Sequence, residues 1–163
     1  MDVNDVVQET LSRVPVPENV EVVRQLDETL PLILADPDQL GQVFRNIILN
    51  GFQAMPGGGR LVVKTSEVSR KLPKSSASSV EPSGWVVVSF ADTGVGIPEE
   101  NRGKLFEPLF TTKAKEIGLG LAIVKMLVKG HGGSIEVEGP STLLSAGGVG
   151  KGSTFTVRLP LAC

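Results

Sequence analysis

The sequence predicts an α/β protein in which amphipathic helices and short apolar strands follow one another along the chain. Three segments have apolar residues at helical spacing, over residues 2–11, 37–55 and 118–128. Five further segments are apolar or alternate between apolar and polar residues, over residues 20–26, 60–67, 85–91, 134–138 and 153–159. Together these patterns predict helices that pack against a sheet within one domain.

Composition limits the class of protein. A chain of 163 residues has the size of one domain and buries roughly 70% of its unfolded surface. The 16 basic and 18 acidic residues leave a formal net charge of -2, so nothing indicates a nucleic-acid partner. No apolar run approaches the ~20 residues that cross a bilayer, and no charged start followed by an apolar run indicates a secretory signal. We therefore expect a soluble domain without direct membrane contact, although it could be cut from a larger membrane protein.

Cysteine and histidine are scarce in this chain. Cys163 is the only cysteine, which excludes an internal disulfide and fits a reducing compartment. His131 is the only histidine, so the chain has too few soft ligands for a zinc site.

The first part of the chain predicts a helix, a strand and the start of a second helix. Residues 2–11 carry valine and leucine at helical spacing behind an acidic first turn, and we expect residues 1–17 to continue from a domain upstream. Two prolines end this pattern, and residues 20–26 then predict a half-buried strand. Asp36 is a good N-cap and Pro37 an ideal first residue for the next helix.

The helix predicted over residues 37–55 carries two asparagines beside its apolar face. Asn46 and Asn50 are four residues apart, so they lie one above the other on the same side of the helix. Asparagine is a mediocre helix former, so the two are either ordinary exposed polar residues or members of a site. In the second case the amide oxygen of Asn50 suits a magnesium ion, while Asn46 helps to hold phosphate.

A single carboxylate follows the apolar strand predicted over residues 85–91. Asp92 stands at the end of this strand, and Gly94 and Gly96 follow it one residue apart. The stretch could be a simple Asp-Thr-Gly turn. Alternatively, Asp92 accepts a hydrogen bond from the exocyclic amine of a flat ring, which the glycines allow to approach closely.

Two glycines also begin the last predicted helix. Gly118 and Gly120 precede an apolar run, and backbone N–H groups at a positive helix end make an anion site, although tight packing would explain the glycines equally well. His131 and the two glycines after it predict an αL cap at the end of this helix. Residues 69–84, rich in serine, lysine and proline, predict a flexible loop.

Four stretches in this order resemble the boxes of the ATP-binding catalytic domain of two-component sensor histidine kinases. They are similar to the N box at residues 40–55, the first glycine box at 92–98, the phenylalanine box at 106–113 and the second glycine box at 118–121. The runs Asn-Gly-Phe-Gln-Ala-Met and Phe-Glu-Pro-Leu-Phe-Thr-Thr-Lys look most like the nitrogen-regulation type. The resemblance covers nearly the whole chain and extends to the superfamily of DNA gyrase, the mismatch-repair ATPase and the heat-shock chaperone ATPase.

The resemblance implies a fold and its ligands. The fold would be the Bergerat ATP-binding fold, a two-layer α/β sandwich with a mixed, mainly antiparallel sheet covered by three helices on one face. The chain would form a single domain over residues 1–163 that binds ATP and Mg2+, with an ATP lid over residues 99–117.

The resemblance also implies roles for individual residues. Asp92 would bind the adenine amino group, and Asn50 would hold magnesium with Asn46 beside it, these two asparagines being the catalytic pair. The other ATP-binding residues would be Gly94, Gly96, Ile97, Lys113, Gly118, Leu119, Gly120 and Leu121.

A domain of this kind would transfer the γ-phosphoryl group of ATP to a histidine on a separate helical dimerisation domain of the same protein, which then feeds a response regulator. Superfamily members that hydrolyse ATP carry a glutamate at the position of Asn46, so hydrolysis by this chain should be slow. We expect the isolated domain to be monomeric, and to be cytoplasmic or the cytoplasmic part of a membrane-anchored sensor.

The second glycine box departs from the family pattern. Its first two positions, usually glycine and threonine, are Glu116 and Ile117 here. Like-charge repulsion disfavours a carboxylate close to the expected phosphates. The alternative is therefore a nucleotide-sensing or protein-docking module that does not transfer phosphate. The loop at residues 139–152 is also longer than the resemblance leads us to expect.

Overall fold

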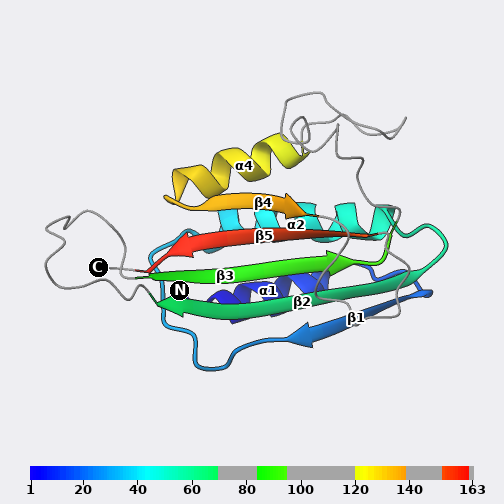
Figure 1. Cartoon of the computed structure of the whole chain (residues 1–163), viewed down its shortest axis with the longest axis horizontal. Helices are drawn as coiled ribbons and strands as arrows, with labels where there is room; N and C mark the ends of the chain where they lie inside the picture. The colour runs from blue at the N-terminus through cyan, green and yellow to red at the C-terminus, as the bar shows by residue number, and fades with distance from the viewer. Residues whose placement is uncertain (70–83, 95–119, 139–151, 162–163) are drawn as a thin grey trace, which may run out of the picture.

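The computed structural model describes residues 1–69, 84–94, 120–138 and 152–161, which form one α/β unit (Figure 1). In chain order the described elements are α1 (Val3–Arg13), β1 (Val20–Gln25), α2 (Pro37–Gln53), β2 (Gly59–Ser69), β3 (Gly84–Asp92), α4 (Gly120–Gly130), β4 (Ser134–Glu138) and β5 (Ser153–Pro160). Each of them corresponds to a helix or strand predicted from the sequence, and the ends differ by at most two residues.

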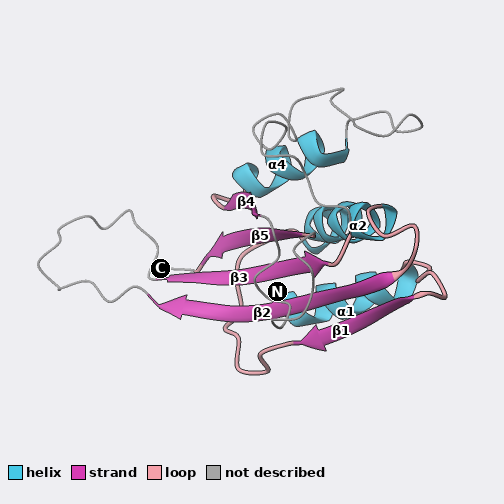
Figure 2. Ribbon diagram, turned by 45° about the vertical axis from the view of Figure 1, so that its right-hand side comes forward, coloured by secondary structure: helices cyan, strands magenta, loops and turns pink. Residues whose placement is uncertain are grey.

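The strands form one sheet in the order β1-β2-β3-β5-β4. β1 and β2 pair in parallel, whereas the other neighbouring strands are antiparallel. The three described helices lie on the same face of this sheet (Figure 2). The predicted two-layer sandwich with a mixed, mainly antiparallel sheet is therefore confirmed.

The helices begin at capping residues that the sequence indicates. The Asp36 carboxylate accepts hydrogen bonds from the backbone N–H groups of Asp38 and Gln39, at 2.9 and 3.2 Å. Pro37 follows as the first residue of α2 and has no N–H to satisfy. Asp2 caps α1 in the same way. None of the helices in the described part of the chain is long and apolar enough to cross a membrane.

A hydrophobic core fills the space between the helices and the sheet. Along β3 the buried residues Val86, Val88 and Phe90 alternate with half-buried ones, as expected for a strand with one face on the core. The rings of Phe44 in α2 and Phe90 lie with their centroids 5.7 Å apart. Because α2 and β3 share this contact, the end of β3 is held at a fixed place beside α2.

A buried polar network joins α1 to the sheet. The Asn4 side chain donates to the Asp27 carbonyl oxygen at 2.7 Å and accepts from the Thr65 hydroxyl at 2.9 Å. The Thr65 oxygen also accepts from the Asp27 N–H at 2.8 Å. Hydrogen bonds from the hydroxyl and N–H of Thr29 hold the pKa of the exposed Asp27 carboxyl below its usual range. The network therefore fixes α1 against β2 by directional bonds.

The sequence predicted a loop at residues 69–84 and an αL cap after α4, and the structure describes the second more fully than the first. Ser69 pairs with Gly84, so both ends of the predicted loop at 69–84 belong to the strands, and residues 70–83 lie outside the described residues. After α4, Gly132 has a φ of 77°, in the left-handed region that favours glycine. The predicted αL cap is therefore confirmed.

Candidate functional site

Asp92 is a buried carboxylate at the end of β3. Asp92 is only 1% exposed to solvent. One carboxylate oxygen accepts from the Gly94 N–H at 2.9 Å, and the other accepts from the Ser153 hydroxyl at 3.0 Å. Burial of a carboxylate is costly without such donors. Asp92 is therefore held in one orientation by the turn that follows β3 and by the first residue of β5.

The helix that carries the two asparagines passes directly beside this carboxylate. At Gly51 of α2, an added Cβ atom would lie 3.9 Å from the Asp92 Cβ and 4.0 Å from a carboxylate oxygen. Asn50 is the preceding residue, and Asn46 lies one helical turn earlier; both are half-buried. The structure thus places Asp92 against the same helix that carries the two predicted asparagines.

The turn after β3 packs against the end of α2. A Cβ atom at Gly94 would collide with the carbonyl oxygen of Ala54, so this position requires glycine for close packing. The neighbouring Thr93 hydroxyl accepts from the Arg60 N–H at 3.0 Å and contacts the Met55 sulfur at 3.5 Å. Gly94 therefore brings β3 close to α2, in addition to any part it has in ligand binding.

The predicted phosphate-binding residues are described only in part. Gly120 and Leu121 form the start of α4, and Leu121 is partly buried against the core. α4 packs beside α2 and β4. The predicted site residues Gly96, Ile97, Lys113, Gly118 and Leu119 lie outside the described residues, as do Glu116, Ile117, the predicted lid at 99–117 and the loop residues 139–151.

Ser153 is a site residue that the sequence reasoning missed. It pairs with Asp92 in the register of β3 and β5, which aims its hydroxyl at the carboxylate. The signal in the sequence is weak, because Ser153 is one of many serines and simply begins a strand after a glycine. Only the pairing of two strands from distant parts of the chain reveals its role.

A groove of about 580 Å3 lies between α1 and α2. Its walls carry charged side chains, among them Arg13, Arg45 and Glu9, and Arg13 pairs with Glu9 at 2.7 Å. Asn46 also borders the groove, whereas Asp92 and Asn50 do not. The groove is therefore separate from the junction of α2, β3 and β5 that surrounds Asp92.

The fold and the buried carboxylate define a class of protein. Residues 35–162 match the family described as histidine kinase-, DNA gyrase B-, and HSP90-like ATPase. The matched range contains α2, β3, α4 and β5, and with them Asp92, Asn50 and Ser153. The chain belongs to this ATPase family.

Within the family, the chain is similar to sensor histidine kinases. It is 37% identical to the sensor histidine kinase ZraS of Escherichia coli (strain K12) over 164 residues, which cover 99% of this chain and 30% of that protein. It is 38% identical to the sensory histidine kinase/phosphatase NtrB of Azospirillum brasilense over 124 residues, 74% of this chain and 30% of that protein. The chain therefore spans less than a third of the length of these curated relatives.

Solved structures agree with the sequence relatives. The mycobacterial sensor histidine kinase MprB matches with a TM-score of 0.77 and 27% identity, over 98% of this chain and 96% of that chain. Full-length ShkA in complex with AMPPNP matches with a TM-score of 0.73 and 26% identity, over 99% of this chain and 30% of that chain. The predicted resemblance to the catalytic domain of sensor histidine kinases is confirmed.

Proposed function

We propose that this chain is the ATP-binding catalytic domain of a sensor histidine kinase, and that it transfers the γ-phosphoryl group to a histidine on a separate helical domain. The observation that carries the proposal is the buried carboxylate of Asp92, held by Ser153 and Gly94 beside α2. Membership of the ATPase family and similarity to sensor kinases support the choice of nucleotide and acceptor.

Asp92 would select adenine through the exocyclic amine of the base. A carboxylate accepts hydrogen bonds and cannot donate them when ionised. Adenine offers an amine at the position where guanine has a carbonyl oxygen, which would face the carboxylate as a second acceptor. Because Ser153 and Gly94 already fix the orientation of the carboxylate, little side-chain freedom is lost when the base binds.

Asn50 would hold a magnesium ion together with the phosphates of the nucleotide. Asn50 fits this role because it offers an amide oxygen, and Mg2+ prefers oxygen ligands. It is half-buried on α2 and directly precedes Gly51, which faces Asp92. When bound, the ion would neutralise part of the phosphate charge. The backbone N–H groups at the start of α4, at Gly120 and Leu121, would contact the phosphates.

Transfer rather than hydrolysis follows from the residue at position 46. Asn46 has no group that can take a proton from water, so water would not be activated from this position of α2. Phosphoryl transfer then depends on positioning and charge stabilisation, with the nucleophile supplied by the histidine of another domain. The relatives are about three times longer than this chain, which leaves room for such a domain in the full-length protein.

The remaining partners follow from the same proposal. The phosphorylated domain would pass its phosphoryl group to a response regulator. The catalytic domain itself would act as a monomer in the cytoplasm, with neither nucleic acid nor membrane as its partner.

Nucleotide binding is tested by calorimetric titration with ADP, GDP and a non-hydrolysable ATP analogue, with and without Mg2+. We expect ADP to bind and GDP to bind much more weakly, and we expect Asp92→Ala and Asp92→Asn to weaken ADP binding at least about 10-fold, or about 1.4 kcal/mol. Glu136→Ala, which removes a carboxylate from the surface of β4, is the matched control. The melting transition of each variant shows that it is folded. Equal ADP affinity in the wild type and a folded Asp92→Asn would contradict the proposal.

Phosphotransfer separates a kinase from a module that only binds nucleotide. The chain is incubated with labelled ATP and with the helical dimerisation domain of its own full-length protein. We expect label on the histidine of that domain and slow phosphate release without it. Nucleotide binding without any transfer would favour the nucleotide-sensing or docking module instead.

A further inference from the structure

We propose that His131 is a positioning residue of the nucleotide site, which acts by tying the end of α4 to the start of α2. This inference rests on the proposed function, because α2 and α4 are the two helices that would meet the magnesium ion and the phosphates. His131 follows the last residue of α4, Gly130, at the opposite end of the helix from Gly120. It therefore acts through the placement of the helices.

Both ring nitrogens of His131 have a backbone partner. Nδ1 lies 2.8 Å from the carbonyl oxygen of Leu127, one turn back in α4. Nε2 accepts a hydrogen bond from the N–H of Asp36 at 3.1 Å. A carbonyl oxygen only accepts and a backbone N–H only donates, so the tautomer with its proton on Nδ1 makes both hydrogen bonds. In this form the ring links α4 to the residue that caps α2.

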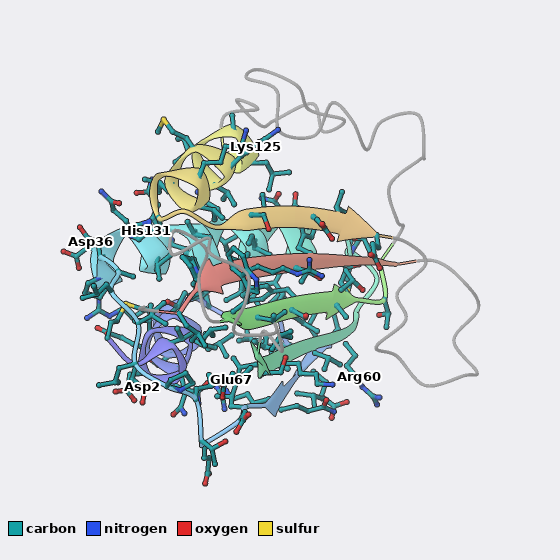
Figure 3. The ribbon with its side chains drawn as sticks, turned by 60° about the vertical axis from the view of Figure 1, so that its left-hand side comes forward. Asp2, Asp36, Arg60, Glu67, Lys125 and His131 are labelled. Carbon is teal, nitrogen blue, oxygen red and sulfur yellow. The ribbon has the colours of Figure 1, made fainter. Side chains whose placement is uncertain are left out.

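Asp36 is the residue through which this link reaches α2. Its carboxylate accepts from the N–H groups of Asp38 and Gln39 in the first turn of α2, while its own N–H donates to His131. The cap of α2 is therefore bonded to the helix on one side and to the end of α4 on the other. Figure 3 shows Asp36 and His131 close together at one end of the molecule, where the yellow α4 ends and the cyan α2 begins.

The turn that carries His131 is itself held against the sheet. The Gly133 N–H donates to the Val128 carbonyl oxygen at 3.0 Å. A Cβ atom at Gly133 would collide with the carbonyl oxygen of Arg158 in β5, so the backbone of the turn lies directly on that strand. His131 thus projects from a backbone that is fixed on one side by α4 and on the other by β5.

A small rotation at this end would displace the other end of α4 by an amount that matters for the proposed site. The helix has 11 residues and is about 16 Å long at 1.5 Å per residue. A tilt of about 10° about its C-terminal end would move its first turn by about 3 Å. Displacements of about 1 Å already lower the rate of a transfer reaction strongly. The hydrogen bonds of His131, at the C-terminal end of α4, therefore affect the position of Gly120 at its N-terminal end.

Hydrophobic packing by itself does not prevent α4 from tilting. Val124 and Val128 are fully buried on the inner side of α4, whereas Met126 is 63% exposed. Hydrophobic contact decides which face of the helix is buried but has no preferred direction, whereas hydrogen bonds require a definite geometry. The two bonds of His131 supply that directional restraint.

The first test measures the relative position of the helices without nucleotide. Spin labels are placed on exposed positions of the two helices through Gln42→Cys and Met126→Cys, in a chain whose native cysteine is replaced by Cys163→Ser. We expect His131→Leu to shift or broaden the distance distribution by about 1 Å or more, because Met126 lies only about one turn from the end about which α4 would tilt. His131→Gln, which offers both an acceptor and a donor, should retain the distribution of the wild type.

The second test measures the affinity for ADP and for a non-hydrolysable ATP analogue by calorimetry. We expect His131→Leu to bind the analogue about 3- to 10-fold more weakly, because binding must then restore the helix orientation that one hydrogen bond maintains in the wild type. His131→Gln should stay within about 2-fold of the wild type. Asn4→Ala, which lowers stability from the far side of α2, is the control and should bind normally.

The outcomes are distinct. Unchanged distances and affinity in His131→Leu would overturn the positioning role, as would an equal loss of affinity in Asn4→Ala, since the effect would then be one of general stability. Failure of His131→Gln to restore the distances would assign the role to the ring rather than to its hydrogen bonds and would overturn the inference as well. If the wild type binds no nucleotide, the proposed function fails, and the distance measurement still decides whether His131 ties the helices together.

Discussion

At the scale of single residues, Asp92 receives its geometry from three parts of the chain. β3 delivers the carboxylate, Ser153 donates to it from β5, and the backbone of α2 at Gly51 lies against it. The hydrogen bonds from Ser153 and from the Gly94 N–H offset the cost of burying a carboxylate. The chemistry of the site therefore depends on a residue, Ser153, that would bind no ligand by itself.

Ser153→Ala should weaken nucleotide binding and lower the stability of the protein without changing its fold. The variant removes one donor from the Asp92 carboxylate, and hydrogen bonds to charged groups contribute about 1.5–3 kcal/mol. We expect ADP to bind about 10-fold more weakly or worse by calorimetry. Ser153→Thr keeps the hydroxyl and should bind ADP nearly as well as the wild type. Normal binding by Ser153→Ala would mean that the Gly94 N–H alone orients the carboxylate.

At the scale of elements, α1 and α4 are held to the rest of the molecule by different means. α1 is joined to β2 by the buried network of Asn4, Asp27 and Thr65. α4 is joined to α2 by apolar packing and by His131 at its end. We therefore expect a change in the attachment of α1 to lower stability, and a change in the attachment of α4 to weaken ligand binding.

Asn4→Ala should destabilise the protein without changing its affinity for nucleotide. The variant leaves the Asp27 carbonyl oxygen and the Thr65 hydroxyl without their partner in the network, and an unsatisfied buried group costs about 1–3 kcal/mol. Urea denaturation measures this loss. Thr65→Val breaks the same network, so the double variant should lose less than the sum of the single variants. Strict additivity would show that the two side chains act independently.

At the scale of the whole molecule, the helices and the sheet form one sandwich around a shared core. Phe44 of α2 and Phe90 of β3 are both at most 1% exposed and lie next to each other at the centre of this core. The same two elements carry Asn50 and Asp92 at their ends near the site. Core packing therefore determines where the functional groups stand relative to one another.

Phe44→Ala should cost about 3–5 kcal/mol, because it removes a large buried ring and leaves a cavity. Total stabilities of domains are about 5–15 kcal/mol, so this single change would remove a large share. Chemical denaturation gives the midpoint and slope of unfolding, and we expect a lower midpoint with an unchanged slope. Phe44→Leu fills more of the space and should lose less. Similar losses in the two variants would show that the core relaxes around the missing ring.

Much of the fold and part of the site could be predicted from local features of the sequence. Periodicity and the Asp36-Pro37 start predict α2. The two glycines after His131 predict the end of α4, where the structure has a left-handed Gly132. Asp92 stands out as a lone acid at the end of an apolar strand. These features are local because caps, turns and amphipathic faces depend on residues a few positions apart.

The sequence by itself determined the helices, the strands, the family resemblance and the carboxylate around which the site is built. The tertiary structure alone decided which residues stand next to that carboxylate and which tie the helices together. Ser153 meets Asp92 across 61 residues, and His131 meets Asp36 across 95. Such contacts follow from strand pairing and from the packing of helices on the sheet. The alternation of apolar residues shows which face of a strand is buried, but it does not show which distant residue becomes its neighbour.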